Sequence, residues 1–493
     1  MTGRLRLPLP LLPLVPALVL LPVTMHLISD LHLGGLDVVL EFWAAALTPS
    51  IDAIQLLTLG RGALVTLLMG IISWLISCAA GMVLGLLCSR RVAALFGHRG
   101  WLSGVLQRLL APLRALHELV WGLLLLQFFG LNGWVSVLAI SCPYTALMAR
   151  VVADQIDNRP SPAAKALHTS GASAAATVIL AVLPEAAAGL MSHMGHRLDC
   201  ALRSAILLGV FGLGGLGTDL SLSLQSLRFH EVWSGLWMLA LLMMALERLR
   251  QRQRLLTGLV LACLVLTPHV LDLQIPQVSL PPWSGSLGSI LQVLQAVPWV
   301  ALIGGTLLVT AIAAALAIGL PPLILLLAPK MRRPRHMLWA LLRLMPAPLT
   351  ALLLLLIVHP SAILAGVALG LHHAGVMGRV MEHDLITTSR QPIQALHQLG
   401  TGKRTIALVG QLAAIARPYL SYGLLRGDVI LRDTPVVGMV GGAGLGWQLI
   451  DALGSFHWEL VVLLLVAYIV LTLIGERISS RVQQSWCCKA VEI

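Results

Sequence analysis

Two groups of charged residues with the same spacing lie within long apolar stretches of this 493-residue chain. Each group reads Arg-x-Asp-x-x-x-Arg, and together they comprise Arg197, Asp199, Arg203, Arg426, Asp428 and Arg432. On a helix, an Asp four residues ahead of an Arg favours an ion pair. Guanidinium groups also bind oxyanions through paired N–H donors. The spacing therefore predicts ion pairs that lock helix packing, or an anion path with a positive lining, and the two roles are compatible.

The depth of these charges in a membrane follows from where their helix begins. If the span starts at Pro184, Arg197 lies about 20 Å along it at roughly 1.5 Å per residue. That position is past the middle of a hydrocarbon core roughly 30 Å thick. Charges at such a depth are costly, so they normally face a wet cavity or one another.

The composition indicates that lipid is the main solvent of this chain. Apolar residues make up 58% of it, charged residues 11%, and the mean hydropathy is +0.89, whereas soluble domains carry about 25% charged residues. The net charge of +12 comes from basic residues placed between apolar runs, which is typical of cytoplasmic membrane loops and not of nucleic-acid contacts. The sequence therefore predicts an all-α polytopic membrane protein in contact with lipid.

Twelve apolar runs are long enough to be candidate spans, six in each half. The run at the N-terminus lacks a small-residue cleavage site, so we expect a first span and not a cleaved signal peptide. The predicted spans are 7–28, 62–88, 115–130, 133–149, 175–205 and 232–247, followed by 255–271, 299–328, 337–358, 361–378, 405–434 and 459–475.

Basic clusters between the spans predict the orientation. Placing Arg90-Arg91, Arg248–Arg254, Lys330–Arg335 and Lys403-Arg404 in the cytoplasm makes the N-terminus cytoplasmic. The acidic stretch 29–60 and the stretch 272–295 are then periplasmic.

The two halves are repeats. Arg379 follows Arg150 by 229 residues, and the same offset relates both charged groups. Such a run of matches indicates an internal duplication, and an even number of spans leaves both copies in the same orientation. We therefore expect two tandem parallel units, residues 1–252 and 253–493, with a pseudo-two-fold pore between them.

A second repeated pattern lies in the loop before each charged group. Alanines, a glycine turn and a downstream Leu183-Pro184 predict two short helices separated by a tight bend. His168 and His397 either contact a partner protein or are solvated. The residues concerned are Lys165, Ala166, Leu167, His168 and Gly171, with their counterparts Gln394, Ala395, Leu396, His397 and Gly400.

This pattern resembles the EAA loop of binding-protein-dependent ABC importer permeases, in which a glycine precedes a Leu-Pro proline by thirteen residues. Gly171 and Leu183-Pro184 fit that spacing. The resemblance implies that 166–171 and 395–400 are coupling helices that dock into an ATPase subunit. The chain departs from the family pattern at Lys165 and Gln394, which replace its Glu, and at Ala413, which replaces the second proline.

The glycine-rich segment after each charged group resembles the C-terminal signature of phosphonate-type permeases. Gly212-x-Gly214-x-x-Gly217 also matches the dinucleotide-binding fingerprint, but that motif requires a preceding strand. Between two membrane spans, close helix packing or a flexible turn at a gate is the better interpretation. The glycines predicted in this role are Gly212, Gly215, Gly217, Gly441, Gly444 and Gly446.

The resemblance implies the permease of a type I ABC importer of phosphonate or a related phosphorus oxyanion in a bacterial inner membrane. Its expected partners are a dimer of ATPase subunits and a periplasmic or lipid-anchored substrate-binding protein. The chain has no Gly-x-x-x-x-Gly-Lys-Ser/Thr loop, so we expect ATP to bind the partner subunit, with no catalytic residue, cofactor or metal site here. The alternatives are a secondary transporter driven by an ion gradient, and a membrane-embedded enzyme.

Overall fold

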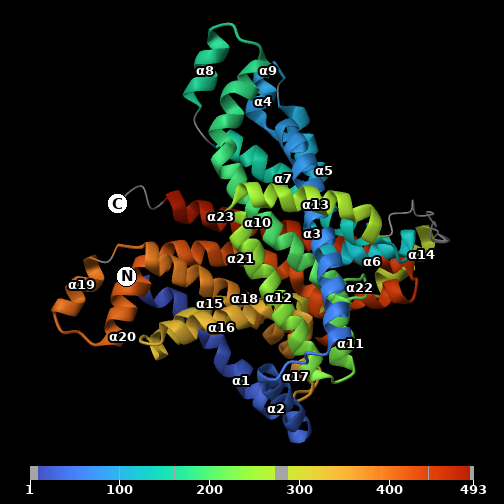
Figure 1. Ribbon diagram of the computed structural model, residues 1–493. Coiled ribbons are helices and arrows are strands. Elements are labelled where there is room, and N and C mark those ends of the chain that lie inside the picture. Colours follow the sequence, from blue (N-terminus) through green and yellow to red (C-terminus); the bar gives the residue numbers. More distant parts are fainter. Residues whose placement is uncertain are drawn as a thin grey trace. The chain divides into compact units, whose positions relative to one another are not determined.

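The computed structural model describes residues 9–98, 100–158, 161–271, 287–389, 391–441 and 444–488 (Figure 1). Within these ranges the chain forms helices and loops, and one isolated antiparallel bridge between Leu31 and Val358. The chain divides into two compact units. We call Ala45–Trp283 the continuous unit, and Met1–Ala44 together with Ser284–Ile493 the split unit.

The helices of the continuous unit run from η3 to α13. They are η3 (Ala45–Leu47), α3 (Ala53–Cys88), α4 (Arg90–Leu95), α5 (Trp101–Ala115), α6 (Glu118–Phe129), α7 (Gly133–Asp157), α8 (Pro162–Thr169), α9 (Ala174–Thr177), the π-helical η4 (Val178–Val182), α10 (Leu183–Val210), α11 (Leu216–Gln225), α12 (Phe229–Arg250) and α13 (Gln253–Val270).

The split unit begins with four N-terminal elements and resumes after the continuous unit. They are η1 (Leu9–Val19), α1 (Leu20–Ser29), η2 (Leu33–Gly35) and α2 (Leu36–Ala44), then α14 (Leu287–Ala296), α15 (Trp299–Leu327), α16 (Arg332–Leu344), α17 (Ala347–Leu355), α18 (Ala362–Thr387), α19 (Gln391–Gln398), α20 (Lys403–Thr405), the π-helical η5 (Ile406–Leu412), α21 (Ala413–Gly441), α22 (Gly444–Gly454) and α23 (Trp458–Cys488).

These elements agree with the predicted spans. Among the described residues, nine helices are long and apolar enough to cross a membrane, and two bent pairs, α5 with α6 and α16 with α17, pass the same test at bends of 87° and 92°. The span predicted at 405–434 is α21, which is 29 residues long but carries several charges. Counted with α21, the helices correspond one to one with the twelve predicted spans.

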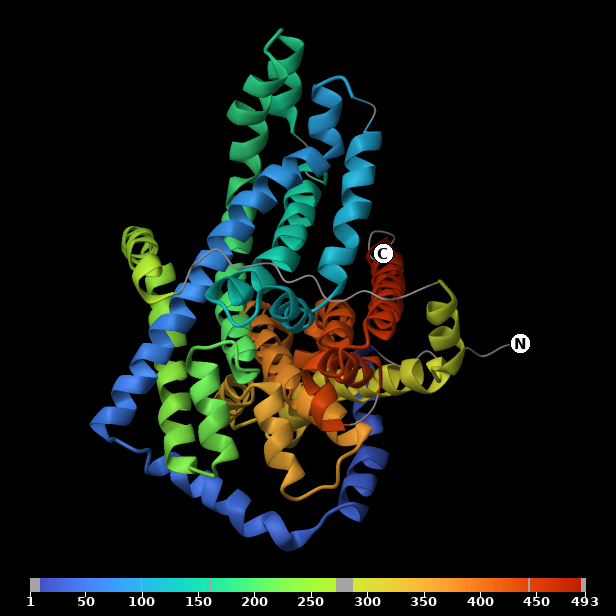
Figure 2. The same ribbon diagram turned by 90° about the vertical axis from the view of Figure 1, so that its right-hand side faces the viewer.

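Glycines bring the central helices of each unit into close contact. In the continuous unit α3 packs along α7 (Figure 2), and a Cβ atom on Gly85 would lie 2.5 Å from the Cβ of Val152. In the split unit α15 packs along α18, and a Cβ on Gly370 would lie 2.9 Å from the Cβ of Leu316. Small residues four apart, such as Gly81 with Gly85, allow this approach of two helices in lipid.

The first span of each predicted repeat belongs to the compact unit that is formed mostly by the other repeat. η1 contacts α15 and α21 of the split unit, with its backbone at Ala17 pressed against Gly319. α13, which opens the second repeat, contacts α3 and α12 of the continuous unit. The compact units therefore do not coincide with the predicted units 1–252 and 253–493. The predicted boundary divides the duplicated sequence, and it stays a prediction.

A buried ion pair joins α16 to α18 and was not predicted from the sequence. Arg335 Nε lies 2.7 Å from Glu382 Oε1, and the two side chains are 6% and 3% exposed. Arg335 also donates to the carbonyl of Ala328. From the sequence, Arg335 was interpreted as part of a basic cluster that sets the topology. In the structure its guanidinium pairs with the buried carboxylate of Glu382, because a buried charge needs an opposite charge beside it.

Substitution of Gly85 tests the packing of α3 on α7. We expect Gly85→Val to destabilise the protein by about 1–3 kcal/mol, because overpacking forces helices apart. Gly60 lies on the same helix, with nothing within 4 Å of the position that a Cβ atom would take, so Gly60→Val should change stability by less than about 0.5 kcal/mol. Thermal unfolding in detergent measures both, and equal midpoints for the two variants would contradict the packing described here.

Candidate functional site: two loop helices and two arginine groups

The first loop helix, α8, is closed at both ends by local hydrogen bonds. Ser161 caps its N-terminus by accepting from the backbone N–H of Ala164 at 3.3 Å. At the other end Gly171 takes a positive φ of +92° and donates to the carbonyl of His168, while Ala172 donates to that of Leu167. These two bonds form a Schellman motif, and the tight bend predicted after α8 is confirmed.

The second loop helix, α19, ends in the same way. Gly400 has a φ of +65° and donates to the carbonyl of His397, and Thr401 donates to that of Leu396. Nothing lies within 4 Å of a Cβ position at Gly171 or Gly400, so the backbone conformation, and not space, requires glycine there. Both copies therefore build one loop geometry at the same offset.

Both loop helices expose the same positions. Leu167 and Leu396 are half-buried, and the other residues predicted to contact a partner are exposed. In α19, Leu396 packs toward η5, where a Cβ on Gly410 would lie 3.1 Å from its Cδ1. The exposed positions are Lys165, Ala166, His168 and Gly171 on one loop, and Gln394, Ala395, His397 and Gly400 on the other.

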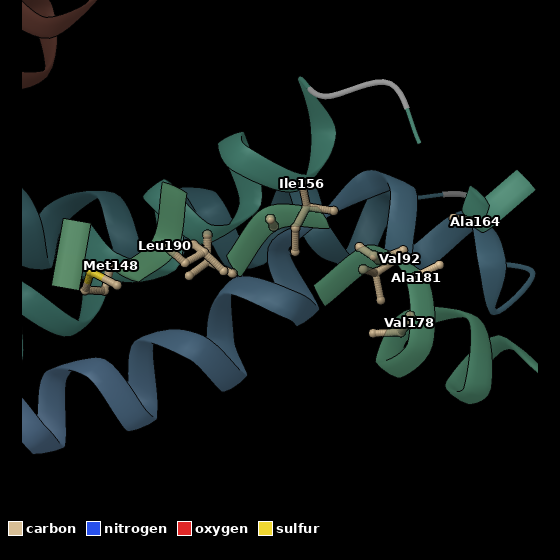
Figure 3. Close-up of a cluster of buried hydrophobic side chains, with 10 residues drawn as sticks. Val92, Met148, Ile156, Ala164, Val178, Ala181 and Leu190 are labelled. Carbon is tan, nitrogen blue, oxygen red and sulfur yellow. The ribbon is translucent and has the colours of Figure 1, made fainter. Parts of the chain in front are cut away.

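A buried apolar cluster connects α8 to the spans beneath it (Figure 3). Ala164 of α8 is 4% exposed and lies in one cluster with Val92 of α4, Ile156 of α7, Val178 of η4 and Leu190 of α10. Because interiors are close-packed, this cluster joins α8 to α7 and α10 without a gap. Figure 1 shows α8, α9 and α4 together at one end of the continuous unit.

Each loop leads through a π-helical turn into the helix with the charged group. The turns are η4 and η5, so the candidate span begins at Ala174, and Arg197 lies about 35 Å along it at 1.5 Å per residue. This start agrees with the predicted span 175–205 and lies ten residues before Pro184, the start assumed for the depth estimate. Proline is not the cause of the π turn, because η5 precedes Ala413, which replaces that proline. π turns inside helices are frequent at functional sites.

The ion pair predicted within each charged group forms in one repeat only. Arg432 donates to Asp428 at 2.5 Å, and Glu476 lies 3.6 Å from the same Arg432 nitrogen. Asp199 instead pairs with Arg250 of α12, at 3.1 Å. Residue 479 occupies the position of Arg250 in the second repeat and is a serine, so it brings no cation to Asp428. The i,i+4 prediction is therefore right for Asp428 and wrong for Asp199.

Arg197 and Arg426 each contact an aromatic ring, and the two rings occupy the same repeat position. The Cζ of Arg197 lies 5.4 Å from the ring centre of Tyr144, a cation–π distance. Arg426 Nε donates to His373 Nδ1 at 3.0 Å, and His373 follows Tyr144 by 229 residues. The sequence analysis did not predict a role for either ring. The signal was present, because the offset of 229 places two rings with polar atoms, Tyr144 and His373, at equivalent positions inside apolar spans.

Behind each ring a polar chain ends in a carboxylate. Tyr144 Oη lies 2.8 Å from Ser204 Oγ, which lies 2.5 Å from Glu118 Oε1. His373 Nε2 lies 3.2 Å from Asp433 Oδ2, and Asp433 occupies the position of Ser204. Since Nδ1 of His373 accepts from Arg426, its proton is assigned to Nε2, facing Asp433.

The rings hold Arg197 and Arg426 in place. Among the described residues, neither guanidinium is in direct contact with a carboxylate. Nε of Arg197 is buried and has no hydrogen-bond partner among the described residues. A guanidinium held by a neutral ring keeps its positive charge and N–H donors for an oxyanion. Asp428 and Arg432, by contrast, neutralise each other.

The predicted glycines mainly serve close packing after each charged group. Leu216 N and Leu445 N donate to Thr66 Oγ1 and Thr306 Oγ1, at 2.9 and 2.8 Å, so equivalent hydrogen bonds hold the starts of α11 and α22. Gly215 and Gly444, which precede these two leucines, have positive φ, as has Gly212, and a Cβ on Gly217 or Gly446 would clash with the preceding helix. Gly441 is the last residue of α21. A gating role for these glycines stays a prediction.

Metal ligation finds no geometric support in the part of the chain that is described. No three His, Cys, Asp or Glu side chains gather there as a potential metal site. His372, beside His373 in the sequence, lies 3.0 Å from the carbonyl of Met345 through its Nδ1.

Comparison with known proteins defines the class. Residues 81–247 match the family described as binding-protein-dependent transport system inner membrane component. This matched segment includes α8 and the first charged group, and the match agrees with the resemblance that the sequence predicted. The family comprises membrane components of ABC transporters, which are not themselves enzymes. The predicted type I importer-like, all-α polytopic fold is confirmed.

Individual relatives are named for transport of phosphorus compounds. HtxE of Stutzerimonas stutzeri, provisionally named a phosphite transport system permease protein, is 30% identical over 144 residues, or 29% of this chain and 55% of HtxE. The chain thus spans about half the length of that relative. The phosphate-import permease protein PhnE of Mycolicibacterium smegmatis is 22% identical over 458 residues, 85% of this chain and 84% of that protein. The phosphite transport system permease protein PtxC of S. stutzeri is 25% identical over 167 residues, 34% of this chain and 59% of PtxC.

The two repeats supply a matched test of the ion pairs. The side chains of Asp428 and Arg432 are 13% and 12% exposed, and those of Asp199 and Arg250 are 23% and 37% exposed. Asp428→Ala should cost about 3–5 kcal/mol, because it leaves a buried guanidinium without its nearest carboxylate. Asp199→Ala should cost about 1 kcal/mol or less. Thermal unfolding in detergent checks this order, and a larger loss for Asp199→Ala would refute it.

Proposed function

We propose that this chain forms the membrane pore of an ABC importer that carries a phosphorus oxyanion into the cytoplasm. Two ATPase subunits dock on α8 and α19, and a periplasmic or lipid-anchored binding protein delivers substrate to the opposite face. The observation that carries the proposal is the duplicated unit of exposed loop helix, π turn and arginine-bearing helix. ATP binds the partner subunits, and the chain needs no cofactor of its own.

The orientation follows from the same loops. In this proposal α8 and α19 face the cytoplasm of a bacterial inner membrane, so the N-terminus is cytoplasmic as well. Each predicted repeat, 1–252 and 253–493, contributes one docking site, and one chain replaces a dimer of single permeases. The match to PhnE of M. smegmatis covers 85% of this chain and so extends over both predicted repeats.

Docking on these loops is by shape and positive charge. The family's Glu is replaced by exposed Lys165 in α8 and Gln394 in α19. In the second loop, Lys330 lies beside Lys403 and lowers the pKa of Lys403, which indicates a concentration of positive charge. We therefore infer that the docking groove of the partner ATPase carries acidic residues.

The substrate class follows from the two arginines and from the relatives. Arg197 and Arg426 keep guanidinium groups held by neutral rings within the spans, and planar N–H forks suit tetrahedral oxyanions. The relatives are named for phosphite and phosphate. Phosphite, phosphonates and phosphate share the negative tetrahedral head that this site would accept.

Removal of the loop glycines tests the coupling. We expect a Gly171→Ala, Gly400→Ala double variant to lose ATPase association and substrate-stimulated ATP turnover, because a positive φ costs a non-glycine residue about 1–2 kcal/mol and distorts each bend. Gly130→Ala is the matched control, since Gly130 has a φ of +64° and open space around it in another loop. Co-purification with the ATPase and turnover in lipid are measured. Normal association of the double variant would refute the docking assignment.

Removal of the ring-held arginines tests the path. Charged hydrogen bonds contribute about 1.5–3 kcal/mol, so Arg197→Gln with Arg426→Gln should lower uptake of phosphite, methylphosphonate or phosphate at least about tenfold. Arg252→Gln with Arg254→Gln removes the same charge from exposed positions and should leave uptake near normal. Equal uptake by the two double variants, at equal abundance and thermal midpoint, would exclude these arginines from the path.

A further inference from the structure

A cavity of about 640 Å³ lies between α4 and the start of α5 in the continuous unit. Its lining includes Arg90 and His98 on one side, and Trp101, Gly104 and Arg108 of α5 on the other. None of these residues belongs to the loop helices or charged groups described above. The cavity is close to the end of the span α3, because α4 begins two residues after Cys88.

The charged side chains that line this cavity are basic, and none of them forms an ion pair with a carboxylate of the described residues. No carboxylate of the described residues lies within 4.0 Å of the side-chain nitrogens of Arg90, His98 or Arg108. Asp157 is near, but its oxygens accept from Ser89 Oγ and from the backbone N–H groups of Arg90 and Arg91. Asp157 therefore caps α4, and the two guanidinium groups remain as uncompensated positive charge.

The wall of the cavity is fixed by hydrogen bonds of α5. Gln107 Nε2 donates to the carbonyl of Cys88 at 2.9 Å, which joins α5 to the end of α3. Ser103 Oγ donates to the carbonyl of Gly100 at 2.9 Å, within the first turn of α5. Arg90 and Arg108 thus project from helices, α4 and α5, whereas His98 lies in the connection between them.

Large apolar side chains extend from the cavity along α5. Trp101 is 70% exposed at its edge, and Leu102 and Leu109 are 45% and 65% exposed further along the helix. Trp at the boundary of an apolar surface is typical of the lipid headgroup region. A basic cavity that continues into an exposed apolar strip matches an amphiphile with an anionic head.

We propose that this cavity binds the headgroup phosphate of an anionic phospholipid, with its acyl chains along the exposed face of α5. Arg90 and Arg108 bind the phosphate, His98 closes the cavity, and Trp101 marks the boundary between headgroup and acyl chains. A soluble anion would not use Leu102 and Leu109, and an acidic protein would not need them, so the apolar strip favours lipid. The site is independent of the proposed substrate path.

Lipid retention tests the proposal on the full chain alone. Delipidated protein is incubated with equal amounts of phosphatidylglycerol and phosphatidylcholine, and the lipid retained is counted by native mass spectrometry. We expect preferential binding of phosphatidylglycerol that weakens at least about tenfold in Arg90→Gln with Arg108→Gln, since each cation near an anionic headgroup contributes roughly fivefold. Arg252→Gln with Arg254→Gln, a charge-matched pair, should retain normal binding.

A second variant keeps the test decisive if charge removal disturbs folding. Gly104 lines the cavity, and a Cβ there meets nothing within 4 Å, so Gly104→Phe fills the cavity while α5 keeps its packing. It should lower phosphatidylglycerol retention, whereas Gly258→Phe, at an equally open position on α13, should not.

Three results would overturn the proposal. Equal losses in the cavity and control variants would show general attraction of anionic lipid to basic residues. Inorganic phosphate that competes as well as phosphatidylglycerol would show a site for soluble anions. Unchanged lipid retention in both cavity variants, together with loss of the co-purifying ATPase, would show a protein-docking surface.

Discussion

A guanidinium group inside an apolar helix bundle needs partners, and the helices around α10 and α21 are arranged to supply them. Arg432 takes two carboxylates, Arg250 takes one, and Arg335 is enclosed with Glu382. Arg197 and Arg426 are held differently, by a neutral ring backed by a carboxylate. The cost of burying charge is therefore met by carboxylates around some arginines and by polar-tipped rings around Arg197 and Arg426. Arg250 thereby links α12 to α10, and Arg432 links α21 to α23.

Equivalent positions of the two repeats make equivalent contacts, but the side chains at these positions differ in chemical type. Arg250 and Ser479 occupy one repeat position, and both donate to the carbonyl of the residue 55 positions earlier, Gly195 or Leu424. Tyr144 and His373 likewise support equivalent arginines through different contacts. The two halves are therefore alike as scaffolds and unlike as electrostatic environments.

Sequence alone predicted the features that depend on local composition. The spans followed from run length and hydropathy, and the bends at Gly171 and Gly400 from the need for a positive φ. The partner of Asp199 could not be predicted, because Arg250 is 51 residues away and competes with a nearer arginine. The cavity at Arg90 was not predicted either, because the angle between the consecutive helices α4 and α5 is not encoded in their apolar pattern. An apolar run also does not indicate which other helix it packs against, so the two compact units could not be predicted from the sequence.

The split unit imposes an order on biosynthesis. η1 and α1 leave the ribosome early, but their main partner α15 begins at Trp299, and α21 follows later still. At a synthesis rate of about 5–20 residues per second, the first span is in the bilayer for roughly 15–60 s before its partner helix α15 is synthesised. During that interval the whole continuous unit is synthesised and inserted. The first span must therefore be stable alone in lipid. Its sequence between Leu9 and Val19 has no polar or charged side chain, although Pro13 and Pro16 inside the helix each remove one backbone hydrogen bond.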